Sequence, residues 1–201
     1  MLKEDVYRYL VDTYKPKAVL FMGSYMDGTA DEFSDFDCVI IVPSKTHARD
    51  ESVIDGVMLD CDIYSVEEVL TEEPTTNALK CHDAEIVLDD GIGMIFMAKV
   101  KLKLEEIRVT TPEEKNQIRC WMEKTAKRSF MADDNGNFRA VMLLWESLPY
   151  YFMLRDLDYF GGKKAIRYLM QNDPKGYDLL HKALETKDPY DIKAWSDHVT
   201  G

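Results

Sequence analysis

Cysteine and long apolar runs are both scarce in this sequence. The four cysteines include no Cys-x-x-Cys pair, and two of them lie inside apolar, strand-like runs where cysteine behaves as a small hydrophobic residue. We therefore expect reduced, structural cysteines. No apolar run approaches the roughly 20 residues that span a membrane, and the first residues lack the charged-then-apolar pattern of a signal peptide. These absences predict a cytoplasmic protein.

Positive charge is also in short supply. Lys and Arg number 25 against 37 Asp and Glu, which gives a formal net charge of -12. A strongly acidic surface repels polyanions, so the composition argues against broad nucleic-acid binding and favours a neutral or cationic small acceptor. The histidines are scattered without the spacing of metal ligands, and we assign no role to His47, His82, His181 and His198.

Apolar periodicity divides the sequence into two parts. The first part predicts helices over 3–14 and 92–107, a helix beginning near Ser65, and strands over 17–22, 36–43, 51–54, 57–64 and 84–88, with a hairpin turn at Asp55-Gly56. The second part predicts helices over about 112–132, 138–157, 163–171, 175–186 and 189–198. We predict an α+β fold: a mixed sheet with flanking helices over 1–107, then an all-helical bundle over 108–201.

Two carboxylates stand one residue apart at the start of an apolar strand. Asp35 and Asp37 precede the run Cys38 to Val42, where an unpaired buried charge would be costly. Side chains two residues apart on a strand project from the same face about 6.6 Å apart, because each residue rises about 3.3 Å. These two carboxylates can therefore share metal ions. The plainer alternative is a solvated strand edge.

A Gly-Ser turn precedes these carboxylates. Gly23 and Ser24 follow the apolar run Ala18 to Met22. If the turn opens a short helix at Ser24, it directs unbonded backbone N–H groups and a positive dipole end toward an anion. A phosphate-bearing substrate bound to Mg²⁺ fits the turn and the carboxylates together.

The order of these motifs resembles the nucleotidyltransferase superfamily that includes DNA polymerase beta, and within it the small antibiotic nucleotidyltransferases. The resemblance covers roughly residues 15 to 107. It rests on Gly23-Ser24, on Ser34-Asp35-Phe36-Asp37, on Leu59-Asp60-Cys61-Asp62-Ile63 running into Ser65-Val66-Glu67-Glu68, and on Ile86-Val87-Leu88-Asp89.

This resemblance implies an enzyme that transfers a nucleoside monophosphate, AMP from ATP in the first instance, to a hydroxyl of a small-molecule acceptor and releases pyrophosphate. It implies two Mg²⁺ ions, because paired ions hold the attacking and leaving oxygens in line in such reactions. The suggested acceptor is an aminoglycoside-like or lincosamide-like antibiotic, bound where the helical part covers the cleft. The resemblance also allows a homodimer.

The resemblance assigns the metal ions to Asp35, Asp37 and a third carboxylate from the strand that holds Asp60 and Asp62. Asp60 and Asp62 share a strand face, and the spacing to Ser65 favours Asp60 as the third ligand. Asp62 could then be a second ligand, a base or a partner of the acceptor. The residues expected to contact the nucleotide are Gly23, Ser24 and Ser34.

One position departs from the family pattern. Many members carry Gly-Ser-x-Ala-Arg-Gly, whose Arg can reach the triphosphate, whereas Asp27 stands at that position here. The departure weakens the expectation of tight triphosphate binding. Lys163, Lys164 or Arg139 of the helical part could supply the missing charge.

In some antibiotic-modifying relatives a Glu of the helical domain acts as general base on the acceptor hydroxyl. Glu146 stands within an otherwise apolar helical run, where burial would raise its pKa and suit it to proton abstraction. A surface salt bridge is an equal alternative for this residue. The aromatic residues around it are expected to be mostly core: Trp145, Tyr150, Tyr151, Phe152, Tyr159 and Phe160.

Two other functions share this fold. A minimal nucleotidyltransferase can serve as the antitoxin of a pair with a helical partner, although this chain carries its own helical half. A non-catalytic nucleotide sensor is the second alternative, which the absent Arg favours and the retained carboxylates disfavour.

Overall fold

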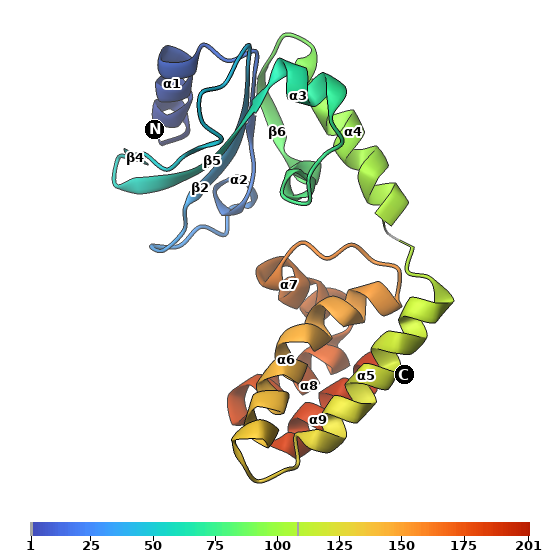
Figure 1. Cartoon of the computed structure of the whole chain (residues 1–201). Helices are drawn as coiled ribbons and strands as arrows, with labels where there is room; N and C mark the ends of the chain where they lie inside the picture. Colours follow the sequence, from blue (N-terminus) through green and yellow to red (C-terminus); the bar gives the residue numbers. More distant parts are fainter. Residues whose placement is uncertain (1, 108) are drawn as a thin grey trace. The chain divides into compact units, whose positions relative to one another are not determined.

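The computed structural model describes residues 2–107 and 109–201 (Figure 1). The chain forms two compact units, Met1–Glu105 and Glu106–Gly201, and each is described by itself. Residues 1 and 108, the first residues of the two predicted domains, lie outside the described residues. Within the described part of the chain, no helix combines the length and apolar composition needed to cross a membrane.

The first unit is built on a mixed sheet. Its strands run in the order β3-β5-β2-β1-β6, and β4 pairs with the first two residues of β5. The β2–β5 pair is parallel and every other pair is antiparallel, which confirms the predicted α+β fold. The strands are β1 Ala18–Phe21, β2 Phe36–Val42, β3 Arg49–Asp50, β4 Val53–Ile54, β5 Val57–Ser65 and β6 Glu85–Asp89. The helices of this unit are α1 Leu2–Tyr14, α2 Ser24–Asp27, α3 Val66–Thr71 and α4 Ile92–Ile107, with a 3₁₀ turn, η1, over Ala78–Asp83.

Strand alternation separates an apolar face of the sheet from a face that carries carboxylates. On the apolar face, α1 packs Val6 and Leu10 against the central strands. The strand residues of this cluster are Val19, Phe21, Phe36, Cys38, Ile40, Val42, Leu59, Cys61 and Ile63. Cys38 and Cys61 are buried, unlinked thiols, as the sequence predicts. The intervening residues of β2 and β5 therefore project from the opposite face.

The edge strand β3 is held to α1 by one buried carboxylate. Asp50 accepts hydrogen bonds from the hydroxyls of Tyr9 (3.0 Å) and Tyr14 (2.7 Å) and from the backbone N–H of Ser52 (2.9 Å). Burial alone would raise the pKa of Asp50, but these hydrogen bonds outweigh it and lower the pKa below its usual 3.8.

We expect Asp50→Asn to lower the free energy of unfolding by about 2 kcal/mol at pH 7, because two phenol donors lose a charged acceptor. Since the folded-state pKa is depressed, the ionised carboxylate stabilises the fold above pH 3.8, and this contribution is lost as the pH falls through the folded-state pKa. Urea unfolding of wild type and variant at pH 7 and at pH 3 measures the difference in their free energies of unfolding at each pH. A gap between wild type and variant that stays equal at the two pH values would contradict this account.

The second unit is all-helical, as predicted. Its helices are α5 Pro112–Arg128, α6 Asp134–Leu154, α7 Gly162–Asn172, α8 Pro174–Thr186 and α9 Pro189–Thr200. The indole N–H of the fully buried Trp195 on α9 donates to Ser147 Oγ on α6 at 2.8 Å, inside the core that these helices share.

The predicted boundary between the first two of these helices is wrong. Asp133 to Gly136 was expected to be a loop, but the side chain of Asp133 caps α6 by accepting from the N–H of Gly136 at 2.8 Å. The helix therefore starts four residues before the predicted position 138. Gly136 is required there because an added Cβ would lie 1.9 Å from the carbonyl oxygen of Met131.

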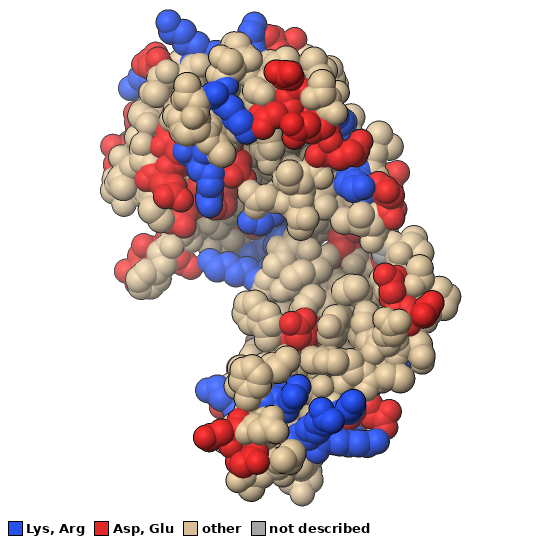
Figure 2. All heavy atoms as spheres, viewed as in Figure 1, with Lys and Arg blue, Asp and Glu red and all other residues tan. Residues whose placement is uncertain are grey.

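Charged side chains of both signs are scattered over the face shown in Figure 2, among uncharged ones. In the view of Figure 2, acidic side chains lie among the basic ones on both units. The expectation that the protein does not bind nucleic acid broadly stays a prediction.

Candidate active site

The Gly-Ser turn joins β1 to the short helix α2. Gly23 has φ 74° and ψ -160°, a conformation that is essentially restricted to glycine, and α2 begins at Ser24 as predicted. The backbone N–H of Met22 donates to the carbonyl of Asp37 at 3.1 Å, which ties the turn to β2. The turn is therefore fixed beside the first strand carboxylate.

Asp37 lies directly against the backbone of Gly23. A Cβ built on Gly23 would stand 2.0 Å from Asp37 Oδ2 and 2.7 Å from Asp37 Cγ. Only glycine leaves space for this carboxylate. The turn and the carboxylate, which the sequence separates by 14 residues, thus form one cradle.

The register of the parallel pair brings a second carboxylate beside Asp37. Asp37 on β2 is opposite Asp60 on β5, and Val39 is opposite Asp62, so all three carboxylates project from the same sheet face. Neighbouring strands are about 4.8 Å apart, which places Asp60 next to Asp37 and Asp62 one step further along β5. The shared face of Asp60 and Asp62 is confirmed.

Asp35 and Ser34 precede β2. Asp35 is exposed, and its role as a metal ligand stays a prediction. Ser34 donates its hydroxyl to Asp31 Oδ1 at 3.0 Å and accepts the N–H of Asp31 at 3.0 Å, so the structure shows it in a local turn. At the position of the family Arg, Asp27 accepts the N–H of Thr29 at 3.1 Å.

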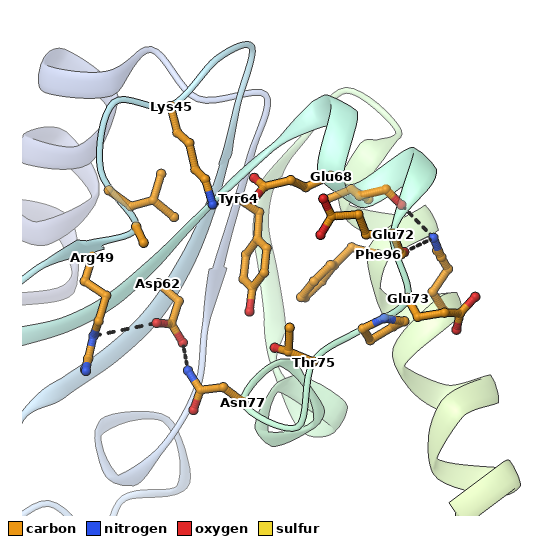
Figure 3. A pocket seen from close by; sticks show the side chains of 15 residues that line it. Lys45, Arg49, Asp62, Tyr64, Glu68, Glu72, Glu73, Thr75, Asn77 and Phe96 are labelled. Atoms are coloured by element: carbon orange, nitrogen blue, oxygen red, sulfur yellow. Dashed lines mark hydrogen bonds and ion pairs between the residues drawn. The ribbon is translucent and has the colours of Figure 1, made fainter.

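Arg49 and Asn77 engage the carboxylates of β5. Arg49 on β3 donates to Asp60 Oδ1, and its Nε lies 3.7 Å from Asp62 Oδ1. Asn77 donates its side-chain amide to Asp62 Oδ2, and Figure 3 shows Asp62 held between Arg49 and Asn77. Burial raises the pKa of Asp62 and the charge of Asp60 raises it further, against the opposing charges of Arg49 and Lys80. Sequence reasoning identified neither Arg49 nor Asn77.

The donor chemistry of this face fits Mg²⁺. Carboxylate oxygens are the ligands that this ion prefers, and Asp37 and Asp60 are direct neighbours in the register. Within residues 2–107 and 109–201, no group of three His, Cys, Asp or Glu side chains converges as a ready metal site. Asp60 is instead paired through Oδ1 with Arg49, so a metal ion would compete with a guanidinium for the charge of this carboxylate.

A pocket of about 250 Å³ opens beside Asp62 on the same side of the sheet. The rings of Tyr64 and Phe96 lie 5.2 Å apart between their centroids and face into the pocket (Figure 3). Lys45 forms an ion pair with Glu68 at 2.5 Å. Further lining carboxylates come from Glu72 and Glu73.

The helix beside this pocket starts where the sequence predicts. Ser65 accepts the N–H of Glu68 at 3.2 Å, and Glu68 accepts the N–H of Ser65 at 2.8 Å, which is a complete capping box. Lys99 of α4 donates to the carbonyl of Val69 at 2.9 Å near the end of α3. These contacts fix the wall of the pocket opposite β5.

Glu146 and Lys163 belong to the second unit. Glu146 is half-buried on α6, and its charge, after burial, raises the pKa of the neighbouring Tyr150. Lys163 is exposed in the first turn of α7. Tyr151 and Phe152 are core residues as expected, but Trp145 is 79% exposed and Tyr159 39% exposed, so the expected core position is wrong for these two. The roles of Glu146 and Lys163 stay predictions.

Comparison with known families gives one match. Residues 4–127, more than half of the chain, match the family described as nucleotidyltransferase domain. No curated protein matches the sequence.

Proposed function

This chain belongs to the nucleotidyltransferase domain family, and on that premise we propose that it transfers AMP from ATP to a hydroxyl of a small-molecule acceptor, with release of pyrophosphate. Nucleotidyl transfer itself follows from the family. The donor nucleotide, the acceptor class and the dependence on Mg²⁺ are the proposal.

The observation that carries the proposal is the cradle formed by Gly23 and Asp37 with Asp60 directly opposite. Asp35, Asp37 and Asp60 would hold Mg²⁺. Bound Mg²⁺ offsets the charge that develops on the transferred phosphoryl group and favours ionisation of the acceptor hydroxyl. The side-chain-free backbone at Gly23 and the hydroxyl of Ser24 would contact the triphosphate, because they lie at the turn that packs directly against Asp37.

The order of the strands separates a donor side from an acceptor side. The Gly-Ser turn follows β1, on one side of β2, whereas the pocket of Tyr64 and Phe96 lies beyond Asp62 on the β5 side. An acceptor seated in this pocket would reach the carboxylates from the side opposite the triphosphate, as in-line displacement requires. The pocket volume suits a small ring carrying a hydroxyl, and the carboxylates of Glu72 and Glu73 favour a cationic one.

For the second unit we propose the roles that the sequence suggests. Glu146 would accept the proton of the acceptor hydroxyl, and Lys163 would contact phosphate. Glu146→Gln tests the first role, because loss of a general base lowers kcat by roughly a hundredfold or more.

Asp60 and Asp62 are expected to differ sharply on substitution. We expect Asp60→Asn to lower kcat by about a thousandfold, because its register opposite Asp37 supports a metal-ligand role worth several kcal/mol. Asp62→Asn, one step nearer the pocket, is expected to raise the acceptor KM by about tenfold with a smaller change in kcat. Steady-state kinetics of both variants measure kcat and the acceptor KM. The reverse pattern would exchange the roles of Asp60 and Asp62.

Incubation with labelled ATP, Mg²⁺ and a panel of hydroxyl-bearing antibiotics tests the function. Transfer of labelled AMP to an acceptor, with pyrophosphate release that disappears in the double variant Asp35→Asn and Asp37→Asn, is the expected result. Pyrophosphate release that persists unchanged in this double variant would refute the proposal.

A further inference from the structure

Arg49 lies beside Asp60, the carboxylate opposite Asp37. We propose that Arg49 is an internal counter-ion that competes with a divalent metal ion for Asp60. The inference rests on the proposed function, because it takes Asp60 as a metal ligand. Arg49 is a positioning residue in this account: it controls whether Asp60 is available.

The backbone directs Arg49 to the carboxylate face. Across β3 and β5, Arg49 is opposite Asp62 and Asp50 is opposite Cys61, so the two residues of β3 point to opposite faces of the sheet. Asp50, 6% exposed, is held by Tyr9 and Tyr14 from the apolar side. This strand of two residues is therefore anchored from behind, and Arg49 is presented to Asp60 by a fixed backbone.

The contacts of Arg49 show what it neutralises. Its guanidinium donates to Asp60, lies 3.7 Å from Asp62 through Nε and lies 3.9 Å from Glu51 through a terminal nitrogen. The Asp62 side chain is 13% exposed and the Asp60 side chain 35%, so solvent screens their mutual repulsion only in part. Arg49 offsets a negative charge on the face that also carries Asp37.

Arg49 and a metal ion draw on the same carboxylate charge of Asp60. Arg49 holds Oδ1, so a divalent ion that takes Oδ1 displaces the guanidinium, and one that takes Oδ2 lies beside the guanidinium and shares the carboxylate charge with it. Both effects weaken metal binding by the protein without nucleotide. Removing the guanidinium is therefore expected to tighten this binding, by about tenfold for a pair of this partial exposure.

Titration calorimetry with Mn²⁺, on the full chain without nucleotide, tests the proposal. We expect Arg49→Gln to lower the Mn²⁺ dissociation constant about tenfold. Arg49→Lys, which keeps the charge but loses the planar fork, is expected to lower it about threefold. Arg8→Gln is the matched control, because it removes an exposed Arg–Asp pair on α1 whose atoms are 3.5 Å apart, and it should leave the dissociation constant unchanged.

A second pair of variants shows whether the effect passes through Asp60. In the Asp60→Asn background, Arg49→Gln is expected to tighten Mn²⁺ binding much less than in the wild type, because only the charge repulsion is then removed. Thermal unfolding supplies an independent readout: Arg49→Gln should lower the Tm of the metal-free protein and enlarge the rise in Tm that saturating Mn²⁺ produces.

If Arg49→Gln and Arg49→Lys leave the Mn²⁺ affinity of the wild type unchanged or lower it, the inference is overturned. The proposed function would still stand in that case. Tightening of undiminished size in the Asp60→Asn background would also overturn the inference. Absence of Mn²⁺ binding in every variant would overturn the inference and leave the proposed function standing, because the metal ion of that function can be held jointly with the triphosphate.

Discussion

Asp37→Asn is expected to lower the rate of nucleotidyl transfer by at least about a thousandfold. Asp37 lies in the cradle against Gly23 and opposite Asp60, a position that supports its proposed role in holding a metal ion beside the Gly-Ser turn. Loss of a ligand that supports several kcal/mol of charge stabilisation corresponds to this factor, since each tenfold in rate is about 1.4 kcal/mol. Pyrophosphate release under saturating ATP and Mg²⁺ measures the change.

Asn is close in shape to Asp, so this variant should keep its fold and its Tm within a few degrees. Asp90→Asn is a suitable control, because the Asp90 side chain forms a surface ion pair with Lys17 at 2.9 Å. It should retain full activity. Activity of Asp37→Asn within tenfold of wild type would show that Asp37 does not hold the metal.

Gly23→Ala is expected to remove activity and to destabilise the first unit by about 2–4 kcal/mol. The new Cβ would lie 2.0 Å from Asp37 Oδ2, and the φ of 74° with ψ of -160° is strained for any residue with a side chain. Asp37 and the turn must then separate, which displaces the carboxylate from the proposed phosphate site. We expect kcat/KM to fall by about a hundredfold or more.

Gly28→Ala is the matched control for this substitution. Gly28 also has a positive φ, 76°, but an added Cβ there meets nothing within 4 Å. It should cost about 1 kcal/mol of stability from backbone strain and leave kcat within a few-fold of wild type. Equal losses of activity in the two variants would mean that backbone strain, and not the approach to Asp37, decides the effect.

The strongest local signals in the sequence predicted the elements that position the site. Asp55-Gly56, with φ 50° and 84°, forms the expected hairpin turn, and Ser65 begins the expected helix with Glu68. Ser24 opens the expected short helix after Gly23. Each of these features depends on residues close together in the chain, which is why sequence alone identified it.

Contacts that depend on strand register were not predictable in the same way. β3 has only two residues, too few to show alternation, so nothing in the sequence placed Arg49 opposite Asp62. The parallel register sets Asp60 opposite Asp37, a neighbour that spacing along the chain, which favoured Asp60 over Asp62, did not reveal. Asn77 reaches Asp62 from the segment before η1, a contact between residues 15 apart that no local pattern signals.

The predicted start of α6 was wrong because the polar residues there suit both a loop and a helix start. Asp133 and Gly136 stand in a stretch typical of loops, yet the same residues form a helix N-cap and a close approach to Met131. Tertiary packing selects the helix start in this case. Exposure of Trp145 likewise depends on which side of α6 faces the core, which helical periodicity assigns only approximately.

The central claim is that Asp37 and Asp60 hold a divalent metal ion beside the Gly-Ser turn at Gly23. A crystal structure with Mn²⁺ and a nonhydrolysable ATP analogue, with the ions located by anomalous scattering, tests it most directly. We predict Mn²⁺ bound to the carboxylates of Asp37 and Asp60, the triphosphate against Gly23 and Ser24, and Arg49 withdrawn from Asp60. A nucleotide bound elsewhere, with Arg49 still paired to Asp60 and no metal at Asp37, would contradict the account.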